Sequence, residues 1–286
     1  MNIEYKKLDS YKELIFLFLY CSILFGFFFN EDTLGGAKPD FLYHYAISDK
    51  FGSNFLQNFK MFGSGDMGTR NSPIFWVIIG FLNKIISFDG LRLLNCLSSL
   101  FIGIFFYKCL LIKFEDQKKI YLIFLSSIIF LSPTIRSLSI WPYSLIWGLL
   151  FFIISIYHFL KIQNNTGTKE QFIIYIKVLS FLILSSYIYP SFGIFYLYFF
   201  SHILFKFKFS KYLIFLLIYS MILSIPAVYY VFENDMISSF NNSQGLSISY
   251  SQALNLSNKI MIIATMFLFF ILPVISFKET FFDFQK

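Results

Sequence analysis

Charged residues are scarce in this sequence. Only 14% of its 286 residues are Asp, Glu, Lys or Arg, whereas roughly 25% is usual for a soluble domain. Hydrophobic residues make up 57% of the chain, and the mean hydropathy is +0.67. Apolar runs near the roughly 20 residues that a bilayer-spanning helix needs recur along the sequence. The composition therefore excludes an ordinary soluble domain and predicts an all-α, polytopic integral membrane protein.

Several motifs of soluble-enzyme chemistry are absent. The sequence contains no Walker A, HExxH or GxSxG pattern, so P-loop nucleotide, zinc-protease and serine-hydrolase sites have no support. Its three cysteines lie in apolar segments without CxxC spacing, which argues against a disulfide framework or a zinc cluster. The net charge of +7 comes from lysines beside apolar runs. That pattern indicates membrane topology and a lipid environment, with no nucleic-acid partner.

The positions of the lysines predict the topology. Lysines precede the first apolar run, which places the N-terminus in the cytoplasm by the positive-inside rule. Counting onward places both termini in the cytoplasm, in one transmembrane domain, 1–286, of the plasma (inner) membrane. About eight spans are predicted, at 14–29, 91–112, 120–136, 143–160, 172–187, 190–205, 211–231 and 258–277.

The first outer loop, 30–90, is the longest polar interruption in the chain. It contains an apolar piece, 73–88, that is either a short span or a helix lying in the membrane interface. If this piece spanned the membrane, the lysine-bearing turns at 161–169 and 206–211 would lie outside, against the positive-inside rule. We therefore expect interfacial helices in the first outer loop. A second outer loop is expected at 232–257.

Arginine is rare, and its positions are informative. The sequence has three arginines, Arg70, Arg92 and Arg136, and the predicted topology places all of them at the outer face. A guanidinium offers a planar fork of donors that suits phosphate oxygens. The three arginines, with Asn71 beside the first, therefore form a candidate binding site for an anionic lipid. The alternative is that they reach the headgroups as ordinary snorkelling side chains.

Asp40 and His44 lie early in the first outer loop. They are four residues apart, so they share one face if this segment is helical. Asp40 can serve as a general base on a hydroxyl or, with His44, as a ligand of a divalent metal. Alternatively, Asp40 is a first-turn acid that complements a helix dipole, and His44 is its structural hydrogen-bond partner.

Three short motifs in order carry a family resemblance. They are Pro-Asp-Phe-Leu-Tyr-His-Tyr-Ala at 39–46, Asn-Ser-Pro-Ile-Phe-Trp at 71–76 and Leu-Arg-Leu-Leu-Asn at 91–95. Their order after a first span resembles the polytopic GT-C glycosyltransferases, of the lipid-A aminoarabinose transferase and protein O-mannosyltransferase type. The resemblance covers about the first two thirds of the chain. Members usually carry more spans and a further C-terminal part, so it implies a short or truncated member.

The resemblance implies an activity and roles for the candidate residues. Such enzymes take a sugar from a polyprenyl-phosphate-linked donor and transfer it to a glycan or lipid acceptor on the outer face. The early loop acid, here Asp40, would be the catalytic base or a metal ligand, and the arginines would hold the donor phosphate. Many members carry a second acid after the third span. The matching segment here, Ile-Trp-Pro-Tyr at 140–143, has no carboxylate.

Three other functions remain open from the sequence. A flippase or transporter of lipid-linked sugars would need polar residues within its spans. A surface-polysaccharide polymerase would place arginines in a late outer loop, but 232–257 contains none. A non-catalytic membrane subunit would need no catalytic acid at all.

Overall fold

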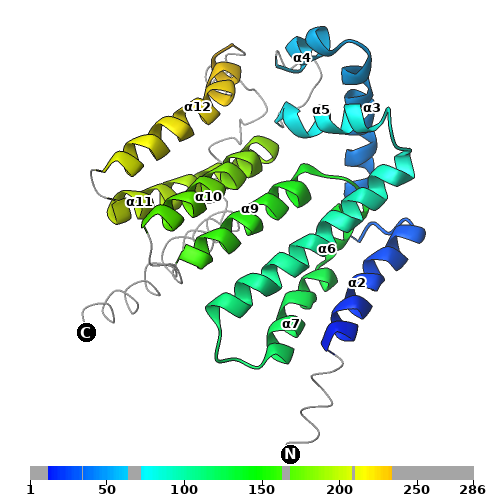
Figure 1. Cartoon of the computed structure of the whole chain (residues 1–286). Coiled ribbons are helices and arrows are strands. Elements are labelled where there is room, and N and C mark those ends of the chain that lie inside the picture. The colour runs from blue at the N-terminus through cyan, green and yellow to red at the C-terminus, as the bar shows by residue number, and fades with distance from the viewer. Residues whose placement is uncertain (1–11, 34, 64–71, 163–167, 208–209, 234–286) are drawn as a thin grey trace, which may run out of the picture. The chain divides into compact units, whose positions relative to one another are not determined.

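The computed structural model describes residues 12–33, 35–63, 72–162, 168–207 and 210–233. These residues form helices joined by short turns, with no strand among them, so the all-α class is confirmed (Figure 1). The helices are α2 (Lys12–Phe28), α3 (Ala37–Ser53), α4 (Phe55–Gly63), α5 (Pro73–Leu82), α6 (Phe88–Lys113), α7 (Lys119–Ser127), η1 (Ile128–Leu131), α8 (Pro133–Ile140), α9 (Ser144–Lys161), α10 (Thr168–Ile188), η3 (Pro190–Ile194), α11 (Phe195–Phe207) and α12 (Lys211–Glu233).

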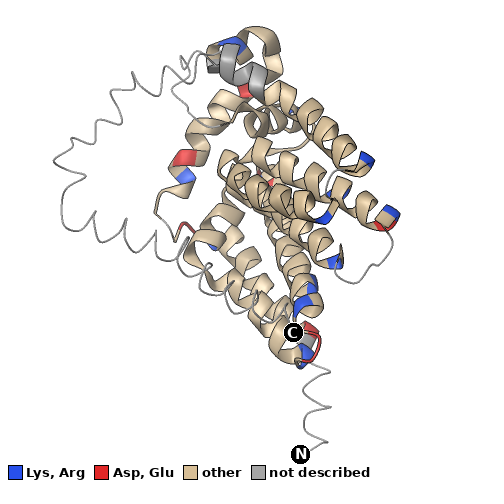
Figure 2. Ribbon diagram, turned by 90° about the vertical axis from the view of Figure 1, so that its left-hand side faces the viewer, with Lys and Arg blue, Asp and Glu red and all other residues tan. Residues whose placement is uncertain are grey.

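Three of the described helices, α6, α9 and α10, are long and apolar enough to cross a membrane. Helix α9 packs against both α6 and α10, so it lies between them (Figure 1). Charged residues gather mainly at helix ends and turns in Figure 2, while most of the ribbon between them carries none. These features support a membrane protein, because charges at the centre of a bilayer are costly.

Several predicted spans correspond to single helices. The predicted spans 91–112 and 143–160 match α6 and α9 closely. Helix α10 begins at Thr168, earlier than the predicted start at 172, and ends at Ile188. The chain then breaks before Pro190, as expected, because proline lacks the N–H that would continue the helical hydrogen bonds.

The predicted span 120–136 is not one continuous helix. Helix α7 runs into η1, which ends at Leu131, and α8 starts at Pro133 after a bend of 66°. Pro133 occupies the first turn of α8, where its missing N–H costs nothing. Arg136 therefore lies on the short helix beyond the bend, in the last part of the predicted span.

Several predicted features lie outside the described residues. These are Arg70, Asn71, the predicted span 258–277 and nearly all of the predicted outer loop 232–257.

Small residues bring the spanning helices close together. Ser185 of α10 donates its hydroxyl to the carbonyl of Gly148 in α9 at 2.7 Å, and Ser155 of α9 donates to the carbonyl of Val178 at 2.9 Å. A Cβ on Gly148 would come within 2.8 Å of the Tyr189 side chain. Close backbone approach through Gly and Ser is the usual packing of helices in lipid, where the hydrophobic effect does not drive association.

Helices α3 and α5 pack in the same close way. Gly80 of α5 lies against the carbonyl of Ser48 in α3, and a Cβ at Gly80 would come within 2.2 Å of that oxygen. Helix α5 has ten residues, which span about 15 Å and do not cross a bilayer core of about 30 Å. Its buried face carries Phe75, Trp76 and Ile79.

The Tyr187 side chain is inserted into the hydrogen-bond ladder of α12. Its hydroxyl donates to the carbonyl of Leu223 at 2.6 Å and accepts from the N–H of Ala227 at 3.1 Å. In an uninterrupted helix, this N–H would donate to that carbonyl directly. Pro226 lies between the two groups and disturbs the helix at this turn. Tyr187 thus joins α10 to the turn of α12 that contains Pro226.

We expect Tyr187→Phe to destabilise the protein by about 1–3 kcal/mol, because two backbone groups of α12 lose their partner. The measurement is the unfolding midpoint of the purified protein in detergent. Tyr189→Phe is the matched control, since the Tyr189 hydroxyl makes no hydrogen bond with the described part of the chain. Equal stability of the two variants would contradict the proposed role of the inserted hydroxyl.

Candidate functional site

The carbonyl end of α8 is held by side chains of α6. Asn95, which is fully buried, donates to the carbonyls of Leu138 and Ser139 at 2.7 Å each. Arg92 Nε donates to the carbonyl of Ile140 at 3.4 Å. These three carbonyls belong to the last turn of the helix, where no backbone N–H follows to bond them. The side chains of α6 therefore take the place of a further helical turn.

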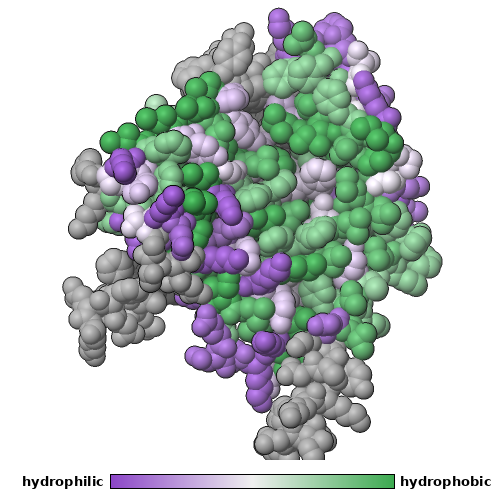
Figure 3. Space-filling view, in the orientation of Figure 1, coloured by the Kyte–Doolittle hydropathy of each residue, from purple (hydrophilic) through white to green (hydrophobic). Residues whose placement is uncertain are grey.

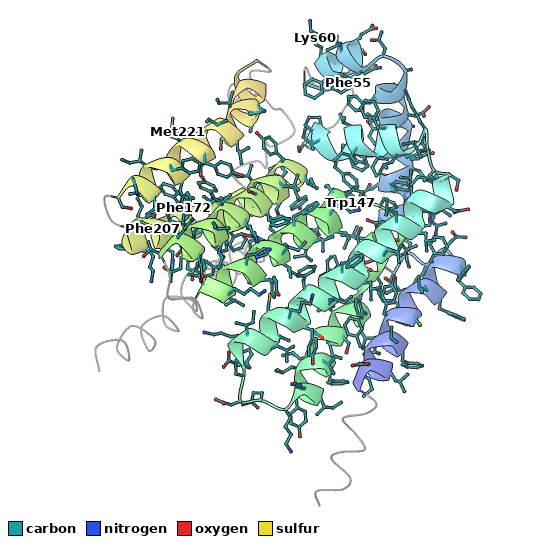
Figure 4. All side chains as sticks on the ribbon, in the orientation of Figure 1. Phe55, Lys60, Trp147, Phe172, Phe207 and Met221 are labelled. Carbon is teal, nitrogen blue, oxygen red and sulfur yellow. The ribbon has the colours of Figure 1, made fainter. Side chains whose placement is uncertain are left out.

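The side chain of Asn95 is itself held in place by a tryptophan. Trp147 of α9 donates its Nε1 hydrogen to Asn95 Oδ1 at 2.9 Å. Trp147, labelled in Figure 4, lies between α9 and α6. Both ends of the Asn95 amide thus have partners, which orients the side chain that bonds α8.

Arg92 is buried at the start of α6. Its side chain is only 5% exposed, and its guanidinium lies 4.1 Å from the ring centroid of Trp141 and 4.6 Å from that of Phe27. It donates to the carbonyl of Phe27 at 3.3 Å and to the carboxylate of Asp89 at 3.0 Å. Arg92 therefore joins α2, α6 and the end of α8 through aromatic stacking and hydrogen bonds.

Arg136 of α8 forms an ion pair with Glu31, which lies in the turn after α2. Both carboxylate oxygens of Glu31 accept hydrogen bonds from the guanidinium, and Ser22 of α2 accepts two more through its hydroxyl and its carbonyl. The hydrogen bonds from Arg136 hold the pKa of Glu31 below its usual value, although burial works in the opposite direction. The pair ties α8 to α2.

The turn between α2 and α3 is ordered by its own polar side chains. The carboxylate of Asp32 accepts from the backbone N–H groups of Gly35, Ala37 and Lys38 at 3.1–3.3 Å. Asp32 therefore satisfies N–H groups at the start of α3, where a carboxylate is favoured by the helix dipole. Asp40 lies in the first turn of the same helix, so the alternative of a first-turn acid that complements the helix dipole agrees with the structure.

Trp141 connects the turn with the start of α3. Its Nε1 donates to the carbonyl of Glu31 at 2.9 Å, and Lys38 Nζ lies 5.3 Å from its ring centroid. We call Glu31, Arg92, Arg136 and Trp141 the Trp141 cluster. The structure thus brings together two of the three predicted arginines, but it gives both of them protein acceptors.

Asp40 is exposed on the first turn of α3. The next residue, Phe41, is fully buried and lies 6.3 Å from Trp141, ring centroid to ring centroid. Asp40 is therefore carried by a helix that is anchored beside the Trp141 cluster, and its carboxylate faces the surface. An exposed carboxylate on an anchored helix can accept a proton from a bound hydroxyl.

His44 lies one turn after Asp40 on α3, so the expectation of a shared face holds. Its Nδ1 donates to the backbone carbonyl of Asp40 at 2.8 Å, and its ring stacks on Trp76 of α5 with centroids 4.5 Å apart and planes 8° from parallel. Burial lowers the pKa of His44 below its usual value. The stacking and the hydrogen bond together fix the orientation of the imidazole ring beside Asp40.

The metal prediction rests on few ligands. In the described ranges, no group of three or more His, Cys, Asp or Glu side chains is arranged to hold a metal ion. Asp40 and His44 alone supply two side-chain ligands. Divalent cations usually take more oxygen or nitrogen ligands than this.

Sequence reasoning missed two members of the Trp141 cluster. Glu31 has a bidentate partner 105 positions away, and no local spacing relates the two. Trp141 was noted only because its segment lacks a carboxylate. The Trp-Pro dipeptide directly after a short polar helix was the available signal, because a tryptophan at a membrane interface usually has a hydrogen-bond partner.

The chain matches no protein-family model, no curated protein and no solved structure.

We expect Glu31→Gln to destabilise the protein at neutral pH by about 1–2 kcal/mol, because charge-assisted hydrogen bonds become neutral ones. The effect should depend on pH. A carboxyl whose pKa is lowered by folding contributes stability above its unfolded pKa, about 4.3 for Glu, and loses it as pH falls through the lower folded value. The unfolding midpoints of wild type and variant should therefore converge at a pH below the folded pKa of Glu31, where the carboxyl is protonated in both states.

Glu115→Gln in the exposed turn between α6 and α7 is the matched control and should change little at any pH. A difference between wild type and Glu31→Gln that stays constant from neutral to acid pH would contradict an ionised Glu31 as the partner of Arg136.

Proposed function

We propose that this chain is a membrane glycosyltransferase of the GT-C type. It would transfer a sugar from a polyprenyl-phosphate-linked donor to a surface glycan or lipid on the extracytoplasmic face. The observation that carries the proposal is the position of Asp40, an exposed carboxylate on the first turn of a helix that is anchored beside a rigid cluster of cations and aromatic rings.

The proposed topology follows the sequence. It has about eight spans, both termini in the cytoplasm, and α3, α4 and α5 lying in the outer interface of the plasma membrane. The charges of α6 support this orientation. Arg92 and Asp89 are near its beginning, whereas Lys108 and Lys113 are near its end, on the side that the positive-inside rule assigns to the cytoplasm.

The proposed reaction begins at Asp40. Asp40 accepts the proton of an acceptor hydroxyl, whose oxygen forms a bond to the anomeric carbon of the donor. The bond between that carbon and the phosphate oxygen breaks, and polyprenyl phosphate leaves with the electron pair. His44 would contact the substrate or, with Asp40, a divalent metal.

The arginines divide into two groups in this proposal. Arg92 and Arg136 have protein acceptors, so a direct contact with the donor phosphate would require them to exchange a partner. We propose that they mainly fix the turn before α3. Lys38, which lies over Trp141, and Arg70 with Asn71, outside the described residues, would contact the phosphate.

A flippase of lipid-linked sugars is the second candidate. The observation in its favour is Lys177, which lies nine residues after the start of α10 at Thr168, deeper than the predicted span placed it. An ionisable residue within a span is costly and usually has a function. No observation in the described residues favours a polysaccharide polymerase or a non-catalytic subunit.

We expect Asp40→Asn to lower sugar transfer by about 100-fold or more, the usual contribution of a general base. The assay supplies polyprenyl-phosphate sugars to membranes that contain the native chain or a variant at matched expression. Asp116→Asn, an exposed acid in the turn at the other end of α6, is the control and should retain full activity.

Full transfer by Asp40→Asn would remove Asp40 from the mechanism. If the folded native chain transfers none of the sugars, a flippase assay with the same donors in vesicles becomes the next measurement, with Lys177→Gln as its variant.

A further inference from the structure

Three lysines from three helices lie near the neighbouring rings of Tyr157 and His158, at the end of α6 opposite Arg92. Lys108 belongs to α6, and Lys161 is the last residue of α9. Lys108 Nζ lies 5.9 Å and Lys161 Nζ lies 4.5 Å from the ring centroid of Tyr157. Two cations thus share one ring, which gains from each by cation–π attraction but does not neutralise their charge.

Lys177 of α10 belongs to the same group. His158 lies beside Tyr157, with ring centroids 5.4 Å apart, and interacts electrostatically with both Lys161 and Lys177. The His158 ring also stacks on Phe181 of α10 at 5.7 Å. We call Lys108, Lys161 and Lys177 the lysine site.

The lysine site has an excess of positive charge. The ion pairs of Arg92 with Asp89 and of Arg136 with Glu31 include neither Lys108 nor Lys177. Exposed cations gathered in one place create a local positive potential that attracts an anion. The Trp141 cluster differs, because its arginines are paired within the protein.

The depth of the three lysines suits a lipid headgroup. Lys161 ends α9, while Lys108 precedes the end of α6 by about 7 Å and Lys177 follows the start of α10 by about 14 Å, at 1.5 Å per residue. Along α6, Lys108 is about 24 Å from Arg92, close to the thickness of a bilayer core. The three side chains can therefore reach the boundary between acyl chains and headgroups by snorkelling.

The surface view agrees with this placement. Hydrophilic side chains form a band across the lower left of Figure 3, over the neighbouring ends of α6, α9 and α10, whereas hydrophobic side chains cover much of the remaining face. Two turns further into the membrane on the same helix faces, the exposed apolar side chains of Phe101 and Leu184 are available to acyl chains. A ligand with both a phosphate and acyl chains fits this combination.

We propose that the lysine site binds the phosphate of an anionic phospholipid from the leaflet at this end of α6. Lys108, Lys161 and Lys177 contact the phosphate oxygens, and Tyr157 occupies the interface beneath the headgroup as tyrosines commonly do. The lipid bridges α6, α9 and α10 at this end of the helices. The proposal depends on membrane insertion and is independent of the proposed sugar transfer.

The test measures phosphatidylglycerol binding to the full-length protein in neutral detergent by native mass spectrometry, with titration of the lipid. We expect the triple variant Lys108→Gln, Lys161→Gln, Lys177→Gln to bind about 100-fold more weakly, since each juxtamembrane lysine contributes about fivefold. The control removes the same charge from the turn after α6, with Lys113→Gln, Lys118→Gln and Lys119→Gln, and should retain most of the affinity. Phosphatidylcholine should bind native protein and both variants weakly and equally.

Three outcomes would overturn the proposal. They are unchanged affinity in the triple variant, equal loss in the two triple variants, and full competition by inorganic phosphate at the concentration of the lipid. If the triple variant does not fold, as judged by its unfolding midpoint in detergent, Lys108→Gln, Lys177→Gln carries the test with an expected loss of about 25-fold. The charge-conserving variant Lys108→Arg, Lys161→Arg, Lys177→Arg should keep the native affinity.

Discussion

The last carbonyls of α8 require partners in surroundings that contain little water. The helix ends directly at Trp141, and no further turn follows to supply N–H donors. Asn95 and Arg92 donate to these carbonyls instead. Leaving a buried carbonyl unpaired costs more free energy than a typical hydrogen bond contributes to stability. The short helix is therefore stable only while α6 lies against it, and this contact sets where the turn before α3 can lie.

The need for several hydrogen-bond donors at one place explains the use of arginine at positions 92 and 136. The planar guanidinium of Arg92 lies between the rings of Phe27 and Trp141 and donates to three acceptors. A lysine ammonium is not planar and could not stack on both rings while it makes these hydrogen bonds. Arg136 binds both carboxylate oxygens of Glu31 in the same bidentate manner. The rare arginines predicted a phosphate site from the sequence. The structure pairs the guanidiniums of Arg92 and Arg136 with protein acceptors, and their contact with a phosphate stays a prediction.

The fold was predictable where hydrophobic length determines it. The spans α6 and α9 follow from apolar runs, and the break at Pro190 follows from the chemistry of proline. The bend before α8 was not predicted, because the apolar run continues through Pro133 and its composition does not distinguish a straight span from a bent one. The insertion of Tyr187 into α12 could not be predicted either. It depends on two helices meeting in space at one hydroxyl.

Helix α6 shows how one span carries two different kinds of positive charge. At its beginning Arg92 is buried and neutralised, so that end can be rigid without an added ligand. At its other end Lys108 is exposed and lies over an aromatic ring. A compact ammonium on a flexible stem keeps its hydration and exchanges partners easily, whereas a stacked guanidinium does not. The two ends are therefore suited to different tasks, the first to holding a fixed geometry beside Asp40 and the second to meeting a mobile anion of the membrane.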